Sequence, residues 1–191
     1  MRTMILILAG AVALSGCATS EAIEVLNTRY QGAAAPLADA GPVALTVVDE
    51  RMQYRTMIGQ KENGYGMDMG AIRSSQPIEQ VVRENLVGAL TARGYDLAAG
   101  DPAMRVAVKS FFADFKSGLL SGSVVPDVRL AVTVSRSGAA DFVKEYDSSG
   151  VEISTLLADG GSAKRALDKA LAAVIDKMVT DPELIAALRT A

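Results

Sequence analysis

The chain contains no histidine, and it has a single cysteine among 191 residues. Without histidine it cannot build Ser-His-Asp or Cys-His catalytic groups, histidine zinc sites or histidine-ligated haem. The lone cysteine excludes an internal disulfide and an iron–sulfur cluster, which needs several thiolates. Stability must therefore come from an ordinary apolar core, and we expect no cofactor.

Motifs for serine catalysis are absent as well. The chain has no Ser-x-x-Lys and no Gly-x-Ser-x-Gly segment, and its nearest approach is Ser162 and Lys164, which lie two residues apart. Ser-Lys and carboxylate-pair mechanisms are the catalytic routes that remain open in principle. We expect a non-enzymatic protein.

The chain also has little excess charge of either sign. The chain has 19 Lys and Arg against 22 Asp and Glu, a formal net charge of -3, and no basic run. Nucleic-acid-binding proteins neutralise phosphates with clustered Lys and Arg. We therefore expect no nucleic-acid partner.

The first residues have the layout of a secretory signal peptide over residues 1–16. Arg2 precedes an apolar run over residues 4–14, and the small residues Ser15 and Gly16 follow it. The run is shorter than the ~20 apolar residues that span a bilayer, so it predicts export rather than a membrane span.

The end of this segment resembles the lipobox of bacterial lipoproteins. Leu14, Ser15 and Gly16 would be the signal-peptidase recognition sequence, and Cys17 the lipidated residue. The resemblance implies that the thiol takes a diacylglycerol group, that the peptide is cut before Cys17, and that the new amine is acylated. Three chains anchor firmly, because each buried methylene adds ~0.8 kcal/mol. Ala18 stands where an aspartate tends to retain such proteins in the inner membrane, so we expect an outer-membrane lipoprotein that faces the periplasm.

The rest of the chain divides into a tether and one domain. Residues 17–41, rich in alanine and interrupted by Gly32 and Pro36, are interpreted as the lipidated cysteine and a flexible tether. A short helix over residues 21–29 is the alternative. Residues 42–191 are long enough for a single periplasmic domain that buries a sizeable core.

Hydrophobic periodicity predicts the elements of this domain. Residues 52–75 contain several glycines and are expected to form a mobile insertion with a loose hairpin. The apolar run over residues 42–48 suits a central strand. The predicted strands are 42–48, 104–115, 127–136 and 141–148, and the predicted helices are 77–93, 161–179 and a short one from 181. This order predicts an α+β fold, with a mixed, mainly antiparallel sheet and two long helices on one face in a two-layer sandwich.

A family resemblance rests on loose motifs over most of the mature chain. The first strand ends in Asp49-x-Arg51, Ile58-Gly59 follows, and the first long helix ends in the residues from Leu90 to Tyr95. With the lipobox, these features resemble the YajG-type family of bacterial lipoproteins. More distantly, the layout resembles auxiliary lipoproteins of envelope lipid transporters. The resemblance implies an envelope lipoprotein and supplies no catalytic residues.

Asp49 and Arg51 form the sharpest polar pair in the sequence. At the end of a strand they could bind a polar ligand. The interpretation that we favour is an ion pair or turn at the strand end, because such pairs are common and weak. Under that interpretation, replacing both residues changes partner or ligand binding little.

Methionines near the insertion offer a soft metal site. Met67 and Met69, with Met52 and Met57 nearby in the chain, carry thioethers of the kind that bind Cu(I). The alternative is apolar filler at a mobile loop. We favour filler, because no histidine or second cysteine supports a copper site.

The segment from Phe111 to Val125 is rich in apolar residues. An alternating strand cannot bury both Phe111 and Phe112 on one face, so two interpretations stay open. Exposed residues would form an interaction surface, with Phe112, Leu119 and Leu120 as its candidates. If the insertion covers the far face of the sheet, the same residues are ordinary core.

Together these observations predict a membrane-anchored, non-enzymatic interaction module. The membrane is its partner through the N-terminal lipid, and an envelope protein of an assembly or transport system is its expected protein partner. The alternative is a carrier of a lipid or small molecule, with a pocket between the sheet and the insertion.

Overall fold

The computed structural model describes residues 21–33, 35–62, 65, 67–97, 100–116, 122–148, 153–155 and 159–189. Several positions singled out from the sequence lie outside these residues: the signal peptide with Leu14, Ser15 and Gly16, the cysteine at position 17, Leu119 and Leu120.

Within the described residues the chain forms eight strands and three helices. The strands are β1 (Ala22–Glu24), β2 (Ala44–Asp49), β3 (Gly59–Glu62), β4 (Asp68–Ser74), β5 (Ala103–Lys116), β6 (Gly122–Ser135), β7 (Phe142–Asp147) and β8 (Ile153–Thr155). The helices are α1 (Ile78–Ala92), α2 (Gly160–Thr180) and α3 (Pro182–Leu188). The strands and helices predicted from periodicity are present near their expected positions, and the hairpin expected in the insertion is β3 and β4.

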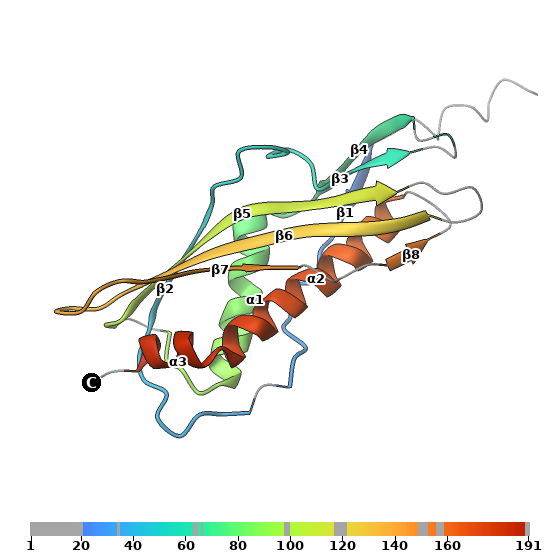
Figure 1. The fold of residues 1–191 in the computed structure, drawn as a ribbon. Coiled ribbons are helices and arrows are strands. Elements are labelled where there is room, and N and C mark those ends of the chain that lie inside the picture. Colours follow the sequence, from blue (N-terminus) through green and yellow to red (C-terminus); the bar gives the residue numbers. More distant parts are fainter. Residues whose placement is uncertain are drawn as a thin grey trace, which may run out of the picture.

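One mixed sheet contains all the described strands, and its middle is the long antiparallel hairpin of β5 and β6 (Figure 1). Each outer edge of this hairpin carries two shorter strands: β2 and β3 pair with β5, and β7 and β8 pair with β6. β4 and then β1 extend the sheet beyond β3. These pairings confirm a mixed sheet in an α/β domain.

The position of β2 corrects one expectation. The apolar run over residues 42–48 suggested a central strand, but among the described strands β2 pairs with β5 alone. The cause is the length of β5, whose edge is shared by β2 on one half and β3 on the other.

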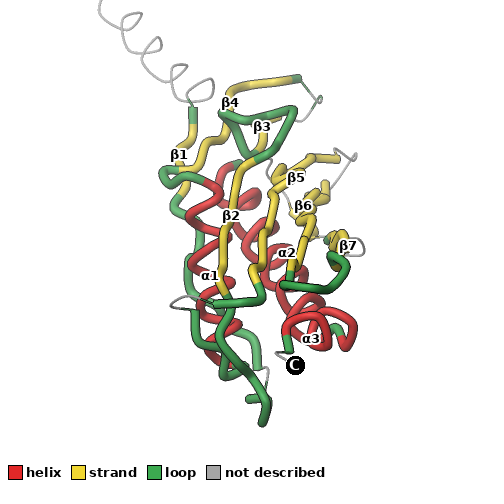
Figure 2. The backbone as a smooth tube through the Cα atoms, turned by 90° about the vertical axis from the view of Figure 1, so that its left-hand side faces the viewer, coloured by secondary structure: helices red, strands yellow, loops and turns green. Residues whose placement is uncertain are grey.

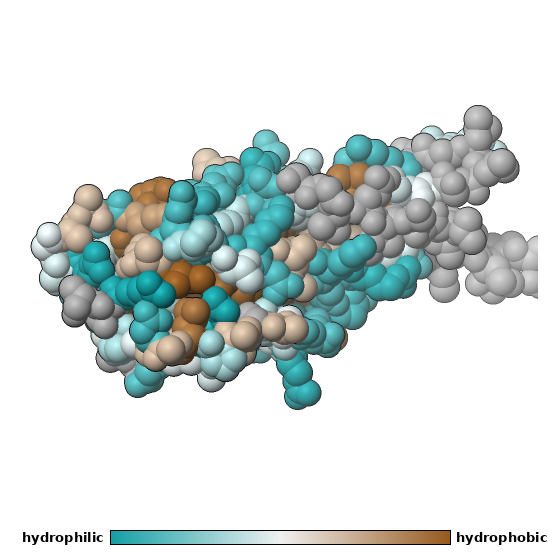
Figure 3. All heavy atoms as spheres, turned by 60° about the horizontal axis from the view of Figure 1, so that its bottom comes forward, coloured by the Kyte–Doolittle hydropathy of each residue, from teal (hydrophilic) through white to brown (hydrophobic). Residues whose placement is uncertain are grey.

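Both α1 and α2 lie on one side of the sheet (Figures 1 and 2). The core fills the space between them and the sheet, because alternate residues of β5 and β6 point toward the helices while the residues between them face away. The largest fully buried side chains are Phe111, Ile58, Ile72, Leu86, Leu90, Met104, Leu130, Leu167, Leu171, Ile175, Met178 and Leu184. Seen from the helix side, apolar residues gather over α3 and the end of α1 (Figure 3).

Local chemistry sets the ends of the helices. Gly94 follows α1 with φ +95°, a conformation that glycine adopts without strain. The Asp159 carboxylate accepts a hydrogen bond from the Ser162 backbone at the start of α2. Asp181 does the same for the Glu183 backbone at the start of α3. None of the described helices is both long and apolar enough to cross a membrane.

The N-terminal segment corrects the prediction of a flexible tether over residues 17–41. Within its described part, β1 pairs in parallel with β4, and Leu26 is only 2% exposed. The Tyr30 hydroxyl donates a 2.6 Å hydrogen bond to Asp176 of α2. Gly88 of α1 allows this packing, since a Cβ there would lie 3.0 Å from the Tyr30 Cβ. The described part of the segment, residues 21–33 and 35–41, is therefore part of the domain, and the alternative of a helix over 21–29 is wrong as well.

Candidate functional site

The segment over residues 50–58 connects β2 to β3 along the edge of β5. β2 ends where Asp49 pairs with Val108, and β3 begins where Gly59 pairs with Ala113. The register of β5 against β6 also shifts between Val108 and Ser110, which marks a bulge. Between these two strands, the backbone N–H and C=O groups at the edge of β5 therefore need hydrogen-bond partners other than a neighbouring strand.

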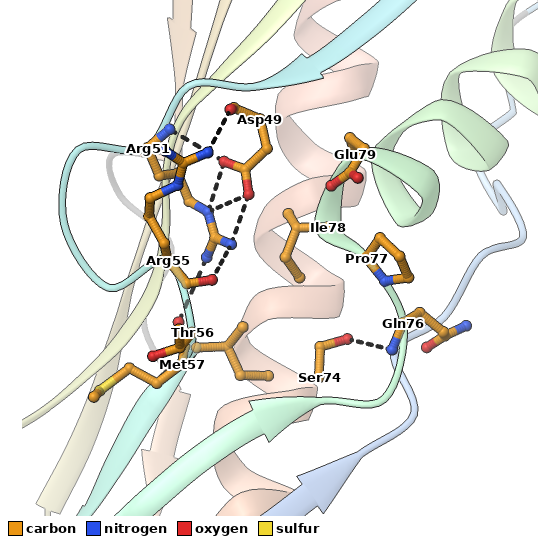
Figure 4. Close-up of a pocket in the computed structure, with 11 residues that line it drawn as sticks. Asp49, Arg51, Arg55, Thr56, Met57, Ser74, Gln76, Pro77, Ile78 and Glu79 are labelled. Carbon is orange, nitrogen blue, oxygen red and sulfur yellow. Dashed lines mark hydrogen bonds and ion pairs between the residues drawn. The ribbon is translucent and has the colours of Figure 1, made fainter.

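The Arg51 side chain enters this gap and is only 4% exposed. Its guanidinium lies 2.8 Å from the Asp49 carboxylate (Figure 4). The same guanidinium donates to the backbone carbonyls of four other residues, at 3.1 to 3.5 Å: Tyr54, Arg55, Met57 and Phe111. Arg51 thus ties the connecting segment to β5 where the strand pairing is interrupted.

The electrostatics of Asp49 follow from this contact. Burial by itself would raise the pKa of its carboxyl, but hydrogen bonds from the Arg51 side chain and backbone outweigh burial and hold the pKa below its ordinary value. The carboxylate is therefore charged at neutral pH. The pair forms at the strand end, as the structural interpretation expected, yet its buried arginine sets it apart from a weak surface pair.

A small polar pocket of about 160 Å³ opens between this ion pair and the start of α1 (Figure 4). Asp49 and Glu79 contribute carboxylates to its wall, and Arg55 contributes a guanidinium. The start of α1 has no side-chain cap, because Pro77 occupies the N-cap position. Charges of both signs in so small a space favour water and internal ion pairing rather than a dedicated anion site.

On the opposite face of the sheet, the same connecting segment presents two exposed side chains. Met52 is 92% exposed and Tyr54 is 48% exposed. The Tyr54 ring stacks on Phe112 of β5, with ring centroids 4.0 Å apart and an interplanar angle of 22°. Tyr54 has φ +53°, a left-handed conformation that is uncommon outside glycine and that the surrounding contacts must stabilise.

Beside this aromatic stack runs an open groove of about 550 Å³. Asp127 and Arg129 of β6 form a 2.9 Å ion pair on its floor, and Ser110 donates a 2.6 Å hydrogen bond to Asp127. These contacts lower the pKa of Asp127, with the hydrogen bond from Arg129 as the largest cause. The charges of Asp127 and Arg129 are thus paired with each other.

Glu50 neutralises the basic residues next to the groove. Its carboxylate accepts hydrogen bonds from Lys109, at 2.7 Å, and from Arg105. These hydrogen bonds, with that from Lys109 first, lower the pKa of Glu50 to about 2. The groove therefore combines the paired charges of Lys109, Asp127 and Arg129 with an apolar rim made of Met52, Tyr54 and Phe112. We call these three residues the apolar rim.

The structure divides the aromatic segment between the two faces of the sheet. Phe111 and Phe115 belong to the core, at 1% and 8% exposure, while Phe112 is half-buried under Tyr54 on the opposite face. Phe111 and Phe115 are thus core residues, and the interaction surface stays a prediction, because Leu119 and Leu120 lie outside the described residues. Sequence reasoning named Phe112 but missed Tyr54 and Met52 as its neighbours, since only the path of the connecting segment brings them there.

The methionines of the insertion occupy separate environments. Met67 is 58% exposed and Met69 is half-buried on β4. Among the described residues, no group of three or more cysteine, aspartate or glutamate side chains could hold a metal ion.

Taken together, fold and site define an α/β domain with one helix-covered sheet face and a preorganised groove on the other. The chain belongs to the family described as uncharacterised lipoproteins, Lipoprotein_16, whose model matches residues 29–189. Among curated proteins, none matches this chain. Family membership supports a lipoprotein with a membrane-anchored envelope location.

Several solved structures are similar to the chain, including the following two. A DUF330 protein from Xanthomonas campestris has a TM-score of 0.55 and 14% identity, over 82% of this chain and 92% of that one. A protein from Helicobacter pylori, described as a homologue of a neuraminyllactose-binding hemagglutinin, has a TM-score of 0.46 and 11% identity, over 85% of this chain and 98% of that one. The likeness to the Xanthomonas protein shows a shared fold and, at that identity, no more.

Proposed function

We propose that the chain is a non-enzymatic interaction module of the cell envelope, anchored by lipid on Cys17 and docking a protein partner against the apolar rim. The observation that carries this proposal is an exposed Met52 beside the stack of Tyr54 on Phe112. Tyr54 has a left-handed backbone conformation, and its carbonyl accepts a hydrogen bond from the buried Arg51. Binding surfaces are commonly built from rigid aromatic and methionine anchors with polar surroundings.

The remaining parts of the proposal are the subcellular location, the family resemblance and the non-enzymatic role. The lipobox-like residues before Cys17 and the alanine after it support an outer-membrane protein that faces the periplasm. The strand ending in Asp49-x-Arg51 supports kinship with YajG-type lipoproteins. The absence of histidine from the sequence supports a role without enzymatic catalysis.

One observation favours the second candidate, a carrier. A volume of about 550 Å³ lies in the range of small-molecule sites, which are ~300–1,000 Å³. Native mass spectrometry of the detergent-extracted lipoprotein separates the candidates, because a carrier retains a bound lipid or metabolite through purification. A spectrum that contains the acylated chain alone supports the module.

Site-specific photo-crosslinking in the native host tests the module. A photoreactive residue replaces Met52 in one variant and Val143, which is 70% exposed on β7, in the control. We expect a discrete protein adduct at position 52 that is absent at 143 and is lost when Tyr54→Ala removes the stack. Equal adduct patterns at both positions, or an adduct at 52 indifferent to Tyr54→Ala, would contradict the assignment of the surface.

A further inference from the structure

The N-terminal segment and the connection between β3 and β4 lie at the same end of the molecule. β1 runs parallel to β4, with Ala22 paired to Ile72, so Glu21 is level with Ala71. Followed backward from Glu21, the strand direction leads toward the start of β4, which pairs with the end of β3. Figures 1 and 2 place these strands at the end opposite α3 and the C-terminus.

The two described residues of this connection have large side chains that are highly exposed to solvent. Tyr65 is 91% exposed and Met67 is 58% exposed. Tyrosine at a membrane places its ring at the headgroup level with its hydroxyl in water. Methionine is flexible and apolar, and it adapts to an irregular environment.

Only four residue steps separate Cys17 from Glu21. At full extension these steps reach about 14 Å. From the level of Ala71, the remainder of β4 to Asp68 advances about 10 Å in the same direction, and Tyr65 belongs to the connection beyond it. A chain lipidated at Cys17 therefore cannot hold the bilayer far beyond this connection.

We propose that Tyr65 and Met67, the two described residues between β3 and β4, contact the bilayer surface, so that the domain touches the membrane at two points, the acyl chains and these side chains. The inference rests on the proposed lipid anchor, because the short segment between Cys17 and Glu21 is what keeps the two side chains close to the bilayer surface. Its consequence is a defined orientation, in which α3 and the C-terminus point away from the membrane.

Absence of tryptophan from the chain makes a direct test simple. Tyr65→Trp introduces a single indole, and Val143→Trp provides the control. Val143 pairs with Thr133, which lies eleven residues along β6 from Gly122 and thus about 36 Å from that end of the sheet. Both full-length lipidated variants are reconstituted into phosphatidylethanolamine and phosphatidylglycerol vesicles, with and without dibrominated acyl chains.

We expect the indole of Tyr65→Trp to shift its emission to the blue and to lose roughly half of its intensity in brominated vesicles, because interfacial side chains sit about 5–10 Å into the headgroup and acyl boundary. The Val143→Trp protein stays unquenched. If Tyr65→Trp floats with the vesicles but is not quenched, the contact is overturned and the connection faces a protein or water. If neither variant floats with the vesicles, the lipid anchor itself has failed, and the inference falls with it.

Discussion

A buried guanidinium is tolerated only when its donors find acceptors, and Arg51 meets this condition in a gap of the sheet edge. It reaches Asp49 and four backbone carbonyls of the connecting segment and β5. Continuous strand pairing would have left no room for it. The same contacts hold the segment that carries Met52 and Tyr54, so the shape of the exposed groove depends on a side chain outside its lining.

Removing this guanidinium is predicted to cost about 3–5 kcal/mol of unfolding free energy in the variant Arg51→Met, because the Asp49 charge and several carbonyls lose their partner. Arg51→Lys keeps a charge without the planar fork and is expected to lose less. The control is Arg129→Met, whose side chain is 48% exposed and whose pair with Asp127 should contribute below about 1 kcal/mol. Urea denaturation of the three variants measures these losses, and similar values for positions 51 and 129 would contradict the role of the gap.

For single residues, the sequence predicts which side chains pair with each other better than it predicts how deeply they are buried. The spacing of Asp49 and Arg51 after an apolar strand indicates an ion pair, and the two side chains do meet. Nothing in that spacing tells that β2 and β3 share one edge of β5, and it is this sharing that buries the arginine. The stack of Tyr54 on Phe112 is hidden for the same reason.

Among the elements, the helices are the most predictable, because α1 and α2 repeat apolar residues every third or fourth position. β1 is the least predictable. It has three residues, one of them exposed Ile23, and it is stabilised by the edge of β4 rather than by its own pattern. Alanine-rich composition around it resembles a linker, although Leu26 and Tyr30 fix the segment to the helices.

A test of this segment compares Leu26→Ala with Ile23→Ala. Leu26 is 2% exposed, so its truncation leaves a cavity and is predicted to cost about 2–5 kcal/mol. Ile23 is 68% exposed, and its truncation should stay within about 0.5 kcal/mol. Chemical denaturation reports both values. A negligible loss at Leu26 would show that the segment is detached in solution and would restore the tether.

For the whole molecule, incorporation of β1 into the sheet changes what the proposed lipid anchor would do. A tether of some twenty residues would let the domain wander several nanometres from the bilayer. Because β1 begins at Ala22, five residues after Cys17, the proposed anchor would instead set both the height and the orientation of the domain. The apolar rim lies on the sheet face away from the helices, because Phe112 alternates with the buried Phe111 along β5, so a protein partner would approach the domain from that side.

Lengthening the segment between Cys17 and Glu21 should therefore allow the domain to move away from the bilayer without altering its fold. Insertion of a ten-residue Gly-Ser segment between Ser20 and Glu21 adds up to about 33 Å of reach, which lifts the short constraint that brings Tyr65 to the surface. In the Tyr65→Trp background we expect quenching by brominated vesicles to fall well below that of the uninserted protein, with unchanged flotation and unchanged urea midpoint. An inserted segment of equal length after Leu188, at the opposite end, is the matched control and should leave quenching intact. If the N-terminal insertion left quenching unchanged, the connection between β3 and β4 would bind the bilayer by its own affinity. The short distance between Cys17 and Glu21 would then not be the cause of the contact.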